Sequence, residues 1–372
     1  MSLRRRDMIV SDFRAESRGG MSRASANVNG IQLWFESRDI ELTAAPEAFG
    51  SALLLASQHR QRRLIIENAV DRTWAENVAM VAAKWAIWWR YKPLLPDAET
   101  TETTGESRAR TTALCFSGGV DSFFSLVTGP RPDFLVAVHG FDISLRDALR
   151  MSGLERTLLQ AAESVGAKPV RIRTNLRDHP ANGRRRLWER SHGGALAAIG
   201  HVLKRRVTHL SISSTYSIAH DRPWGSSVHT DPLFSSSDLQ IVHFGTAPRE
   251  EKIRAILTHP MVRTHLRVCW ENRNPEGNCS RCAKCLLVML HLAEYGVLHE
   301  FVVFEGKDEL SDRIDALPYV TTHIAVMQRA IQRGELEPRL REAAARLVRR
   351  SLRAATWHKW RTYAGNMADR YV

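Results

Sequence analysis

Short apolar runs and longer amphipathic stretches alternate along the middle of the chain. The apolar runs, rich in Val, Ile, Leu and Phe, predict strands over residues 113–116, 134–143, 169–175, 209–215 and 240–245. Apolar positions at helical spacing predict helices over residues 123–127, 145–166, 193–206 and 285–296. Strands that alternate with helices in this way predict an α/β fold with a doubly wound parallel sheet.

The chain before residue 111 has a pattern of its own. Strand and helix signals predict a small αβ region over residues 28–94, with elements at 31–37, 47–58, 63–70 and 74–91. The stretch 95–110, rich in Thr and Glu, predicts a linker. Residues 1–27 are interpreted as a mobile tail.

Length and composition agree with a globular protein of two domains or one enlarged domain. The chain has 372 residues, of which 44% are hydrophobic and 25% charged. We divide the remainder into the main α/β domain (111–265), a cysteine-rich segment with its helix (266–300) and a helical C-terminal region (301–372). No apolar run approaches the about 20 residues that a bilayer requires, and no secretory signal is evident. We therefore expect a cytoplasmic protein without a membrane partner.

The chain is basic, with a formal charge of +13 and a pI near 10.0. This balance suits a polyanion such as tRNA, but it also suits a protein whose only anionic ligand is ATP. The basic segment 337–355 has apolar residues at helical spacing, so it is either the solvated face of a packed helix or a nucleic-acid surface. A nucleic-acid partner is compatible with the charge and is not required by it.

The segment CFSGGVDSFFSLV, residues 115–127, lies between a predicted strand and a predicted helix. Gly118 and Gly119 allow a sharp turn that presents bare amides at a helix N-terminus, where an anion is favoured. Ser117 and Ser122 supply hydroxyl donors, and Asp121 is a suitable Mg²⁺ ligand. The segment lacks the Lys of a Walker A loop and the third Gly of a dinucleotide fingerprint. The alternative is an ordinary glycine-rich turn.

The six residues Ser117, Gly118, Gly119, Val120, Asp121 and Ser122 resemble the signature of the PP-loop ATP pyrophosphatase superfamily. The resemblance implies a twisted parallel sheet with helices on both faces, of the adenine nucleotide alpha hydrolase (HUP) type. It also implies that the loop binds the pyrophosphate end of ATP with Mg²⁺. ATP would then be cleaved between its α and β phosphates, leaving an adenylylated substrate.

Four of the five cysteines crowd into one segment: Cys269, Cys279, Cys282 and Cys285. The C-x-x-C-x-x-C spacing, with the first Cys brought back by the NPEGN turn, predicts a closed, structural Zn²⁺ site. Two disulfides and an iron–sulfur cluster are the alternatives, of which disulfides are disfavoured in a cytoplasmic chain. Cys115 lies on a predicted strand and is interpreted as a small buried apolar residue rather than a nucleophile.

The loop and the cysteine pattern together resemble the 7-cyano-7-deazaguanine synthase family, over about residues 110–300. The resemblance implies that the turn His139–Gly140–Phe141 grips adenosine. It makes Asp231 a candidate ligand of substrate or Mg²⁺, and it implies that Arg249 and Lys252 reach phosphate. Asp121, Asp231 and Lys252 would form the catalytic set. Surface charge or helix capping explains Asp231, Arg249 and Lys252 equally well, and His139 is equally explained as a strand-end histidine bonded to backbone.

The expected function is that of an ATP-dependent carbon–nitrogen ligase. ATP would adenylylate 7-carboxy-7-deazaguanine or a related acid, and an amine would then displace AMP to give an amide or a nitrile. The regions 1–110 and 301–372 exceed the synthase pattern, so the amine or acid can equally belong to a protein or peptide. Added regions of this kind resemble those of synthase relatives in antiviral gene clusters. The rival functions are tRNA thiolation and a non-catalytic nucleotide-sensing protein.

Overall fold

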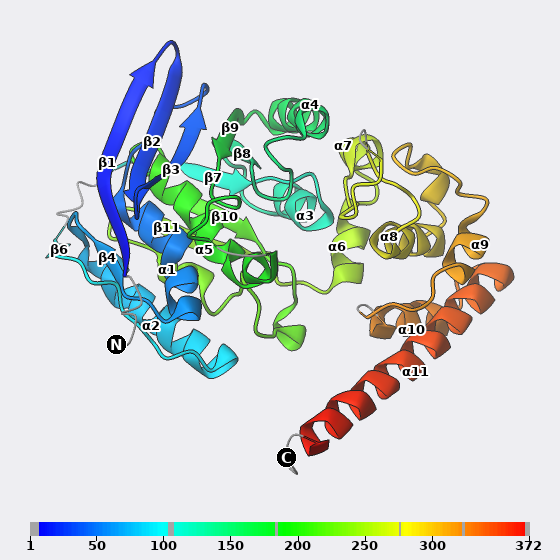
Figure 1. The fold of residues 1–372 in the computed structure, drawn as a ribbon. Coiled ribbons are helices and arrows are strands. Elements are labelled where there is room, and N and C mark those ends of the chain that lie inside the picture. Colours follow the sequence, from blue (N-terminus) through cyan, green and yellow to red (C-terminus); the bar gives the residue numbers. More distant parts are fainter. Residues whose placement is uncertain (1–6, 103–107, 183–184, 275–276, 322–323, 369–372) are drawn as a thin grey trace. The chain divides into compact units, whose positions relative to one another are not determined.

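Two compact units make up the protein, Met1–Pro248 and Arg249–Val372, and we describe each by itself (Figure 1). The computed structural model describes residues 7–102, 108–182, 185–274, 277–321 and 324–368, with side chains except those of 185–186 and 357–368. The boundary between the units lies just before residue 249, whereas the sequence suggested a boundary at 265/266.

Within the described residues of the first unit, nine strands form one mixed sheet. In spatial order these are β11 (Gln240–Phe244), β10 (His209–Ser213), β7 (Thr112–Cys115), β8 (Phe134–His139), β9 (Lys168–Thr174), β3 (Ile31–Ser37), β2 (Met21–Val28), β1 (Met8–Arg18) and β4 (Leu64–Ile66). The five strands from β11 to β9 are parallel. Each overlaps a strand predicted from the sequence, so the α/β class with a largely parallel sheet is confirmed.

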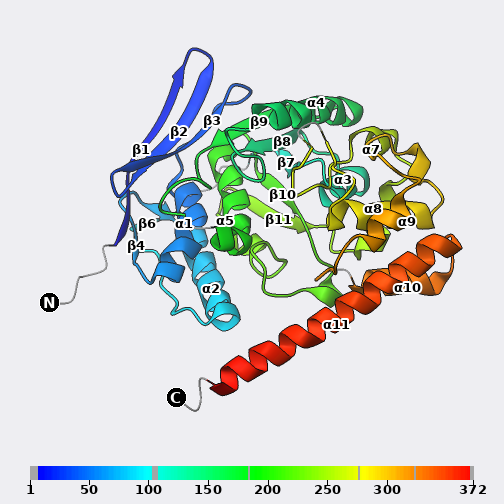
Figure 2. The ribbon, with the colours of Figure 1, turned by 45° about the vertical axis from the view of Figure 1, so that its right-hand side comes forward.

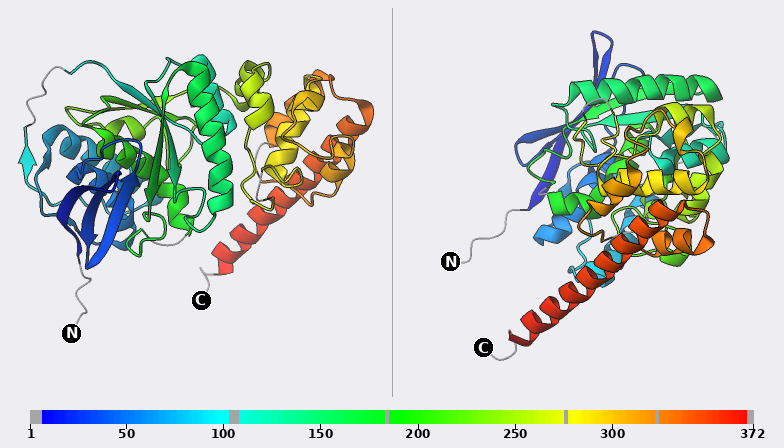
Figure 3. Two further views of the ribbon diagram at one scale, coloured as in Figure 1. Left: turned by 90° about the horizontal axis from the view of Figure 1, so that it is seen from above. Right: turned by 90° about the vertical axis from the view of Figure 1, so that its right-hand side faces the viewer.

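Helices cover both faces of the parallel strands (Figure 3). Helices α3 (Val120–Thr128) and α4 (Ala148–Val165) lie on one face, and α5 (Arg185–Leu203) lies on the other with α1 (Pro46–Arg60) packed along it. Helix α2 (Arg72–Trp89) contacts α1 and the short 3₁₀ turn η2 (Asp231–Phe234). This arrangement follows from right-handed crossovers, which change face when the chain reverses direction across the sheet.

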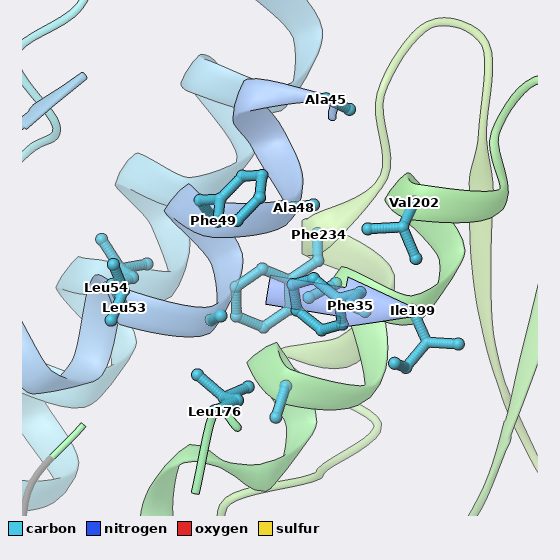
Figure 4. Packing of buried hydrophobic residues seen from close by; sticks show 14 of the residues in the cluster. Phe35, Ala45, Ala48, Phe49, Leu53, Leu54, Leu176, Ile199, Val202 and Phe234 are labelled. Carbon is cyan, nitrogen blue, oxygen red and sulfur yellow. The ribbon is translucent and has the colours of Figure 1, made fainter. Parts of the chain in front are cut away.

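The largest apolar core of the first unit lies around α1 and α5 (Figure 4). Phe35 from β3 and Phe49 from α1 are fully buried, with ring centroids 5.8 Å apart in an edge-to-face arrangement. Ile199 and Val202 of α5 and Phe234 of η2 complete this part of the core. The core therefore joins the N-terminal region to the parallel sheet.

Residues 8–28 correct the expectation of a mobile tail over 1–27. They form β1 and β2, which pair with each other and continue through β3 into the parallel sheet by antiparallel contacts between β3 and β9 (Figure 2). The two hairpins close through Gly19–Gly20 and through Asn29–Gly30, all at positive φ. The N-terminal region is therefore part of one sheet rather than a separate αβ unit on a linker.

The stretch 95–110, expected as a linker, is partly structured. Asp97 bridges to Ile65, and β6 (Thr100–Thr101) pairs with β5 (Val70–Asp71). Residues 103–107 lie outside the described part.

The second unit consists of helices and a cysteine cluster. The helices are α6 (Arg249–Ile256), α7 (Pro260–His265), α8 (Ala283–Glu294), α9 (Leu310–Asp315), α10 (Ile324–Arg333) and α11 (Pro338–Ala368). The expectation of a helical C-terminal region is confirmed. None of the helices in the described parts of the chain is long and apolar enough to cross a membrane.

The basic face of α11 is partly neutralised inside the second unit. Arg346 binds Asp315 at 2.6 Å, Arg339 binds Asp312 at 2.6 Å, and Arg350 donates to three backbone carbonyls between residues 314 and 317. These contacts favour the reading of segment 337–355 as the polar face of a packed helix.

Candidate functional site

The SGGVDS loop connects the carboxyl end of β7 to the start of α3. Strand β7 lies between β8 and β10. The chain adds β8 and β9 on one side of β7 and then crosses back to add β10 and β11 on the other side. In sheets of this kind, ligands bind in the crevice at the carboxyl ends of the strands where the order reverses. The loop lies at that point of the sheet.

The backbone of the loop suits an anion. Gly118 has a φ of +71°, in the left-handed region that residues with a Cβ rarely adopt, and Gly119 is the N-cap of α3. The buried Ser122 hydroxyl donates to the Gly119 carbonyl at 3.1 Å and lies 3.4 Å from the amide and the hydroxyl of Ser117. Ser122 therefore braces the loop, whereas Ser117 is exposed. The first amides of α3 have no acceptor within the helix and add to the positive end of its dipole.

The next two loop residues begin α3. Val120 is buried, and the side chain of Asp121 is half-buried in the first turn of the helix. A carboxylate in a first turn is favourably placed against the helix dipole. Asp121 thus belongs to the same surface as the loop amides.

The turn after β8 is held tightly. Gly140 has a φ of +109°, and a Cβ there would lie 1.9 Å from the Thr174 carbonyl oxygen, so a side chain cannot be accommodated. Nε2 of the buried His139 donates to the Ser144 carbonyl at 2.8 Å. His139 is thus bonded to the backbone, as one of the two readings of the sequence proposed. Phe141 is buried, with its ring centroid 5.0 Å from that of Trp188.

Asp231 is fully buried in the first unit and bonded on both oxygens. Its Oδ2 accepts from the Ser226 hydroxyl at 2.6 Å and from Nδ1 of His243 at 2.8 Å, and its Oδ1 accepts from the Ser227 amide at 3.2 Å. Asp231 is therefore not a surface charge.

Cys115, the last residue of β7, is a poor nucleophile in this setting. Burial, and secondly the negative charge of Asp231, raise the pKa of its thiol to about 12. The thiolate, which is the reactive form of cysteine, is thus strongly disfavoured. The expectation of a buried Cys115 is confirmed.

Two polar residues that directly follow strands β9 and β10 have structural partners. The Asn175 side chain accepts from the Trp34 amide at 3.0 Å and donates to the Gln32 carbonyl at 2.9 Å, so it ties β9 to β3. The Ser214 hydroxyl donates to the Tyr216 carbonyl at 2.6 Å. Both contacts order the carboxyl edge of the sheet.

Arg249 and Lys252 lie at the start of α6, in the second unit. The Lys252 side chain is 0% exposed, and Arg249 is half-buried. Because a buried ammonium group is costly unless it is paired, Lys252 is not a solvated surface charge.

The four cysteines of the second unit form one compact cluster. All four sulfur atoms lie within 4.8 Å of one another, with Cys269–Cys282, Cys279–Cys285 and Cys282–Cys285 at 4.0, 3.9 and 3.4 Å. A tetrahedron of thiolates at the usual Zn–S distance of about 2.3 Å has edges of about 3.8 Å, which these separations match. They are far longer than the roughly 2 Å of a disulfide bond. The cluster fits a single tetrahedral ion better than two disulfides.

Polar contacts around the cluster hold it in shape. The Asn278 side chain accepts from the amides of Val268 and Cys269 at 2.8 and 3.1 Å and donates to the Leu266 carbonyl at 2.7 Å. It thereby joins the first cysteine to the C-x-x-C-x-x-C segment. The NPEGN turn expected at this point includes residues 275–276, which lie outside the described part.

One thiol of the cluster is poised to ionise. Contacts with the Cys285 thiol and with neighbouring backbone and thiol groups outweigh burial and lower the pKa of Cys282. Cys282 is also the N-cap of α8, so the helix dipole favours its thiolate. Metal ions bind thiolates, so a lowered thiol pKa favours metal binding at the cluster.

Sequence reasoning missed two of these partners. His243 was read only as part of a strand, and Asn278 only as part of a turn. No motif marks the contact between Asp231 and His243, because η2 brings the two residues together across twelve positions of sequence. Asn278 is a polar residue directly before Cys279, and this position alone is a weak sequence signal for its role.

Comparisons with known proteins do not place the chain in a family. No protein-family model and no curated protein matches it. Among solved structures, it is similar to one described as "Structure of a Type III CRISPR defence DNA nuclease activated by cyclic oligoadenylate", at 11% identity and a TM-score of 0.22. The match covers 86% of this chain and 57% of that chain, so this chain spans little more than half of the nuclease. A similarity at this level carries no argument about fold or function, and the function has to be argued from the residues of the site.

Proposed function

We propose that the protein is an ATP-dependent ligase that adenylylates a carboxylate, releases pyrophosphate and transfers the acyl group to an amine. The observation that carries the proposal is the position of the SGGVDS loop, at the reversal point of parallel strands ordered β9-β8-β7-β10-β11. This order belongs to doubly wound nucleotide-binding sheets. The loop sequence resembles that of PP-loop ATP pyrophosphatases, and the fold is accordingly proposed to be of their HUP type.

The proposed first step requires stabilisation of negative charge on the leaving group and no proton transfer. A carboxylate oxygen attacks the α-phosphorus of ATP, and the bond to the β-phosphate oxygen breaks with its electron pair going to pyrophosphate. The amides after Gly118, the Ser117 hydroxyl and a Mg²⁺ ion held by Asp121 would stabilise the charge on the leaving group. The turn at His139–Phe141 is proposed to bind adenosine.

The acid is proposed to be 7-carboxy-7-deazaguanine or a related carboxylate, as the resemblance to the synthase family implies. The amine is ammonia or an amino group of a protein or peptide. Attack by this amine on the acyl adenylate expels AMP and gives an amide, which a second round can convert to a nitrile.

We infer that the four cysteines bind one Zn²⁺ ion with a structural role. Four thiolates complete the tetrahedron and leave no position for a substrate. An iron–sulfur cluster would place several atoms between the thiolates and separate them more widely than the 4.8 Å limit observed. The ion would link the segment at Cys269 to α8.

The rival function of tRNA thiolation is less well supported. Enzymes that carry sulfur on the protein need an accessible cysteine with a low pKa. Cys115 is the one cysteine outside the cluster, and it is buried with its pKa raised to about 12. A nucleotide-sensing protein without activity remains the second candidate, and it requires ATP binding without turnover.

Product analysis tests the proposal. The protein would be incubated with ATP, Mg²⁺, ammonium and 7-carboxy-7-deazaguanine, and the nucleotides separated. The proposal predicts AMP and pyrophosphate that depend on the acid, and their loss in Asp121→Asn. Accumulation of ADP would contradict it, and ATP binding without products would favour the sensing protein.

A further inference from the structure

The pair Asp231–His243 lies beside the loop, and the adenylylation step proposed above uses neither residue. In the register of the sheet, Ile212 of β10 is opposite His243 of β11. Continuing the register of β7 and β10 by one residue places Cys115 opposite Ile212. His243 therefore lies two strand spacings, about 10 Å, from the residue where β7 ends and the loop begins. Its side chain is 3% exposed.

The contacts of Asp231 determine which nitrogen of His243 carries a proton. A carboxylate accepts hydrogen bonds, so Nδ1 of His243, 2.8 Å from Oδ2, is the donor. In the neutral ring Nε2 is then unprotonated and can accept a proton. Within the described residues, no group hydrogen-bonds to Nε2 of His243, while Ser226 and Ser227 hold the carboxylate in place.

Other buried histidines of the first unit are built differently. Nε2 of His139, His179 and His201 contacts the backbone carbonyls of Ser144, Ile31 and Phe234, so in these rings the nitrogen is a donor that fastens two segments. Among the described residues of this unit, His243 is the buried histidine that a carboxylate holds. A carboxylate that fixes the tautomer and orientation of an imidazole is the arrangement of a general base.

We propose that His243 is the general base of the second half-reaction, in which the amine attacks the acyl adenylate, and that Asp231 is its positioning residue. The inference rests on the proposed function. The amine nitrogen forms a bond to the acyl carbon, and its proton passes to Nε2 of His243. The bond between the acyl carbon and the phosphate oxygen then breaks, and its electron pair leaves with AMP.

This role assigns separate groups to the two half-reactions. Adenylylation releases no proton from a nucleophile, because the attacking carboxylate is already ionised, so it does not need His243. Amide formation does need a base, because an amine that has attacked is left with a surplus proton. Loss of His243 should therefore affect the second half-reaction selectively.

The test uses His243→Asn in the full-length protein. The Asn side-chain amide can donate to Asp231 as Nδ1 does, but it supplies no base. With 7-carboxy-7-deazaguanine as the acid, pyrophosphate release in a single turnover should stay within about threefold of the wild type. Amide formation from ammonium should fall by about 10²- to 10⁴-fold, the usual contribution of a general base.

Hydroxylamine should rescue the activity of His243→Asn if His243 is a base, and should not rescue it if the role of His243 is only structural. It is largely unprotonated at neutral pH and is a strong nucleophile, so hydroxamate formation by His243→Asn should fall less than about tenfold. The matched control is His291→Asn, which alters a buried histidine bonded to a carboxylate in the second unit and should affect ammonium and hydroxylamine equally. If His243→Asn does not fold, His243→Gln is compared in the same way.

Each outcome decides the inference. An equal loss of pyrophosphate release, amide and hydroxamate in a folded variant would overturn it, as would an unchanged rate with ammonium. A wild-type protein that releases no pyrophosphate with the acid would instead refute the proposed function, and the inference with it.

Discussion

The SGGVDS loop and the four-cysteine cluster are built in opposite ways. The loop depends on backbone conformation: one glycine at positive φ and the start of a helix leave amides directed outward. The cluster depends on side chains: four sulfur atoms within 4.8 Å face one another and leave no open direction. An open array of donors suits a ligand that arrives and departs, whereas a closed one suits an ion that stays. The predictions below test this contrast.

Gly118→Val should have the largest effect, because the loop works through its backbone. A β-branched residue at a φ of +71° adds strain of about 1–3 kcal/mol and blocks approach to the amides. We expect ATP affinity, measured by calorimetry, to fall by at least about 100-fold. The control is Gly153→Ala, in the interior of α4, which should leave affinity unchanged and add slight stability. Unchanged affinity in Gly118→Val would show that the loop does not bind ATP.

Asp121→Asn separates charge from shape in the same loop. The substitution keeps the volume of the side chain, so the fold should persist while the proposed Mg²⁺ ligand is weakened. Loss of one preorganised contact of this kind costs about 10²–10³ in turnover. Rates of AMP formation would be compared with those of Asp178→Asn, an exposed aspartate outside the loop. Equal rates in the two variants would remove Asp121 from the site.

Cys282→Ser should act on stability. The purified wild type should contain about one Zn²⁺ per chain without visible charge-transfer colour, and the variant should contain much less. Because metal binding is coupled to folding, the melting temperature should fall by roughly 10 °C or more, at about 2–4 °C for each kcal/mol lost. Cys115→Ala, outside the cluster, should retain its metal. A brown protein with iron would contradict the zinc assignment.

The smallest effect is expected at the ion pairs of the second unit. Burial opposes ionisation of Glu294, but hydrogen bonds from His291 and Arg333 outweigh it and lower its pKa from 4.5 to about 2. A lowered pKa stabilises the fold above pH 4.5, and this contribution is lost as the pH falls toward 2. Glu294→Gln should therefore be less stable than the wild type in urea at pH 6, with the difference narrowing below pH 4.5.

A matched control distinguishes the loss of the Glu294 charge from a general effect of substitution. Glu309→Gln removes an exposed partner of Arg313 and should change stability by less than about 1 kcal/mol at any pH. A pH-independent loss in Glu294→Gln would mean that packing, rather than charge, holds α10 to α8.

The parallel strands were predictable because buried apolar residues recur along them, in a continuous run in β8 and at alternate positions in β9 and β10. The segment 134–139 is an example, and its strand matches the expectation. Strand β2 was missed because its buried side is made mostly of small residues such as Ala24 and Ala26, and β1 was missed because it has no buried residue after Val10. The Asn29–Gly30 pair before β3 was a hairpin signal, and it marks the turn between β2 and β3.

The two kinds of site also differ in how well the sequence predicted them. The loop and the four cysteines could be located from short spacings, since each is formed by residues close together in sequence. The contacts of Asp231 with His243, and of Asn175 with β3, join residues distant in sequence and required the fold. Sequence patterns identify what a short segment can bind, whereas the fold determines what is placed beside it.

The central claim is that the loop holds the β and γ phosphates as one leaving group. The most direct test is isotope exchange, in which labelled pyrophosphate is incubated with the protein, ATP, Mg²⁺ and 7-carboxy-7-deazaguanine without an amine. Reversible adenylylation predicts label in ATP that depends on the acid and is lost in Gly118→Val. Absence of label from ATP, with unlabelled ADP and phosphate formed from ATP instead, would contradict the account.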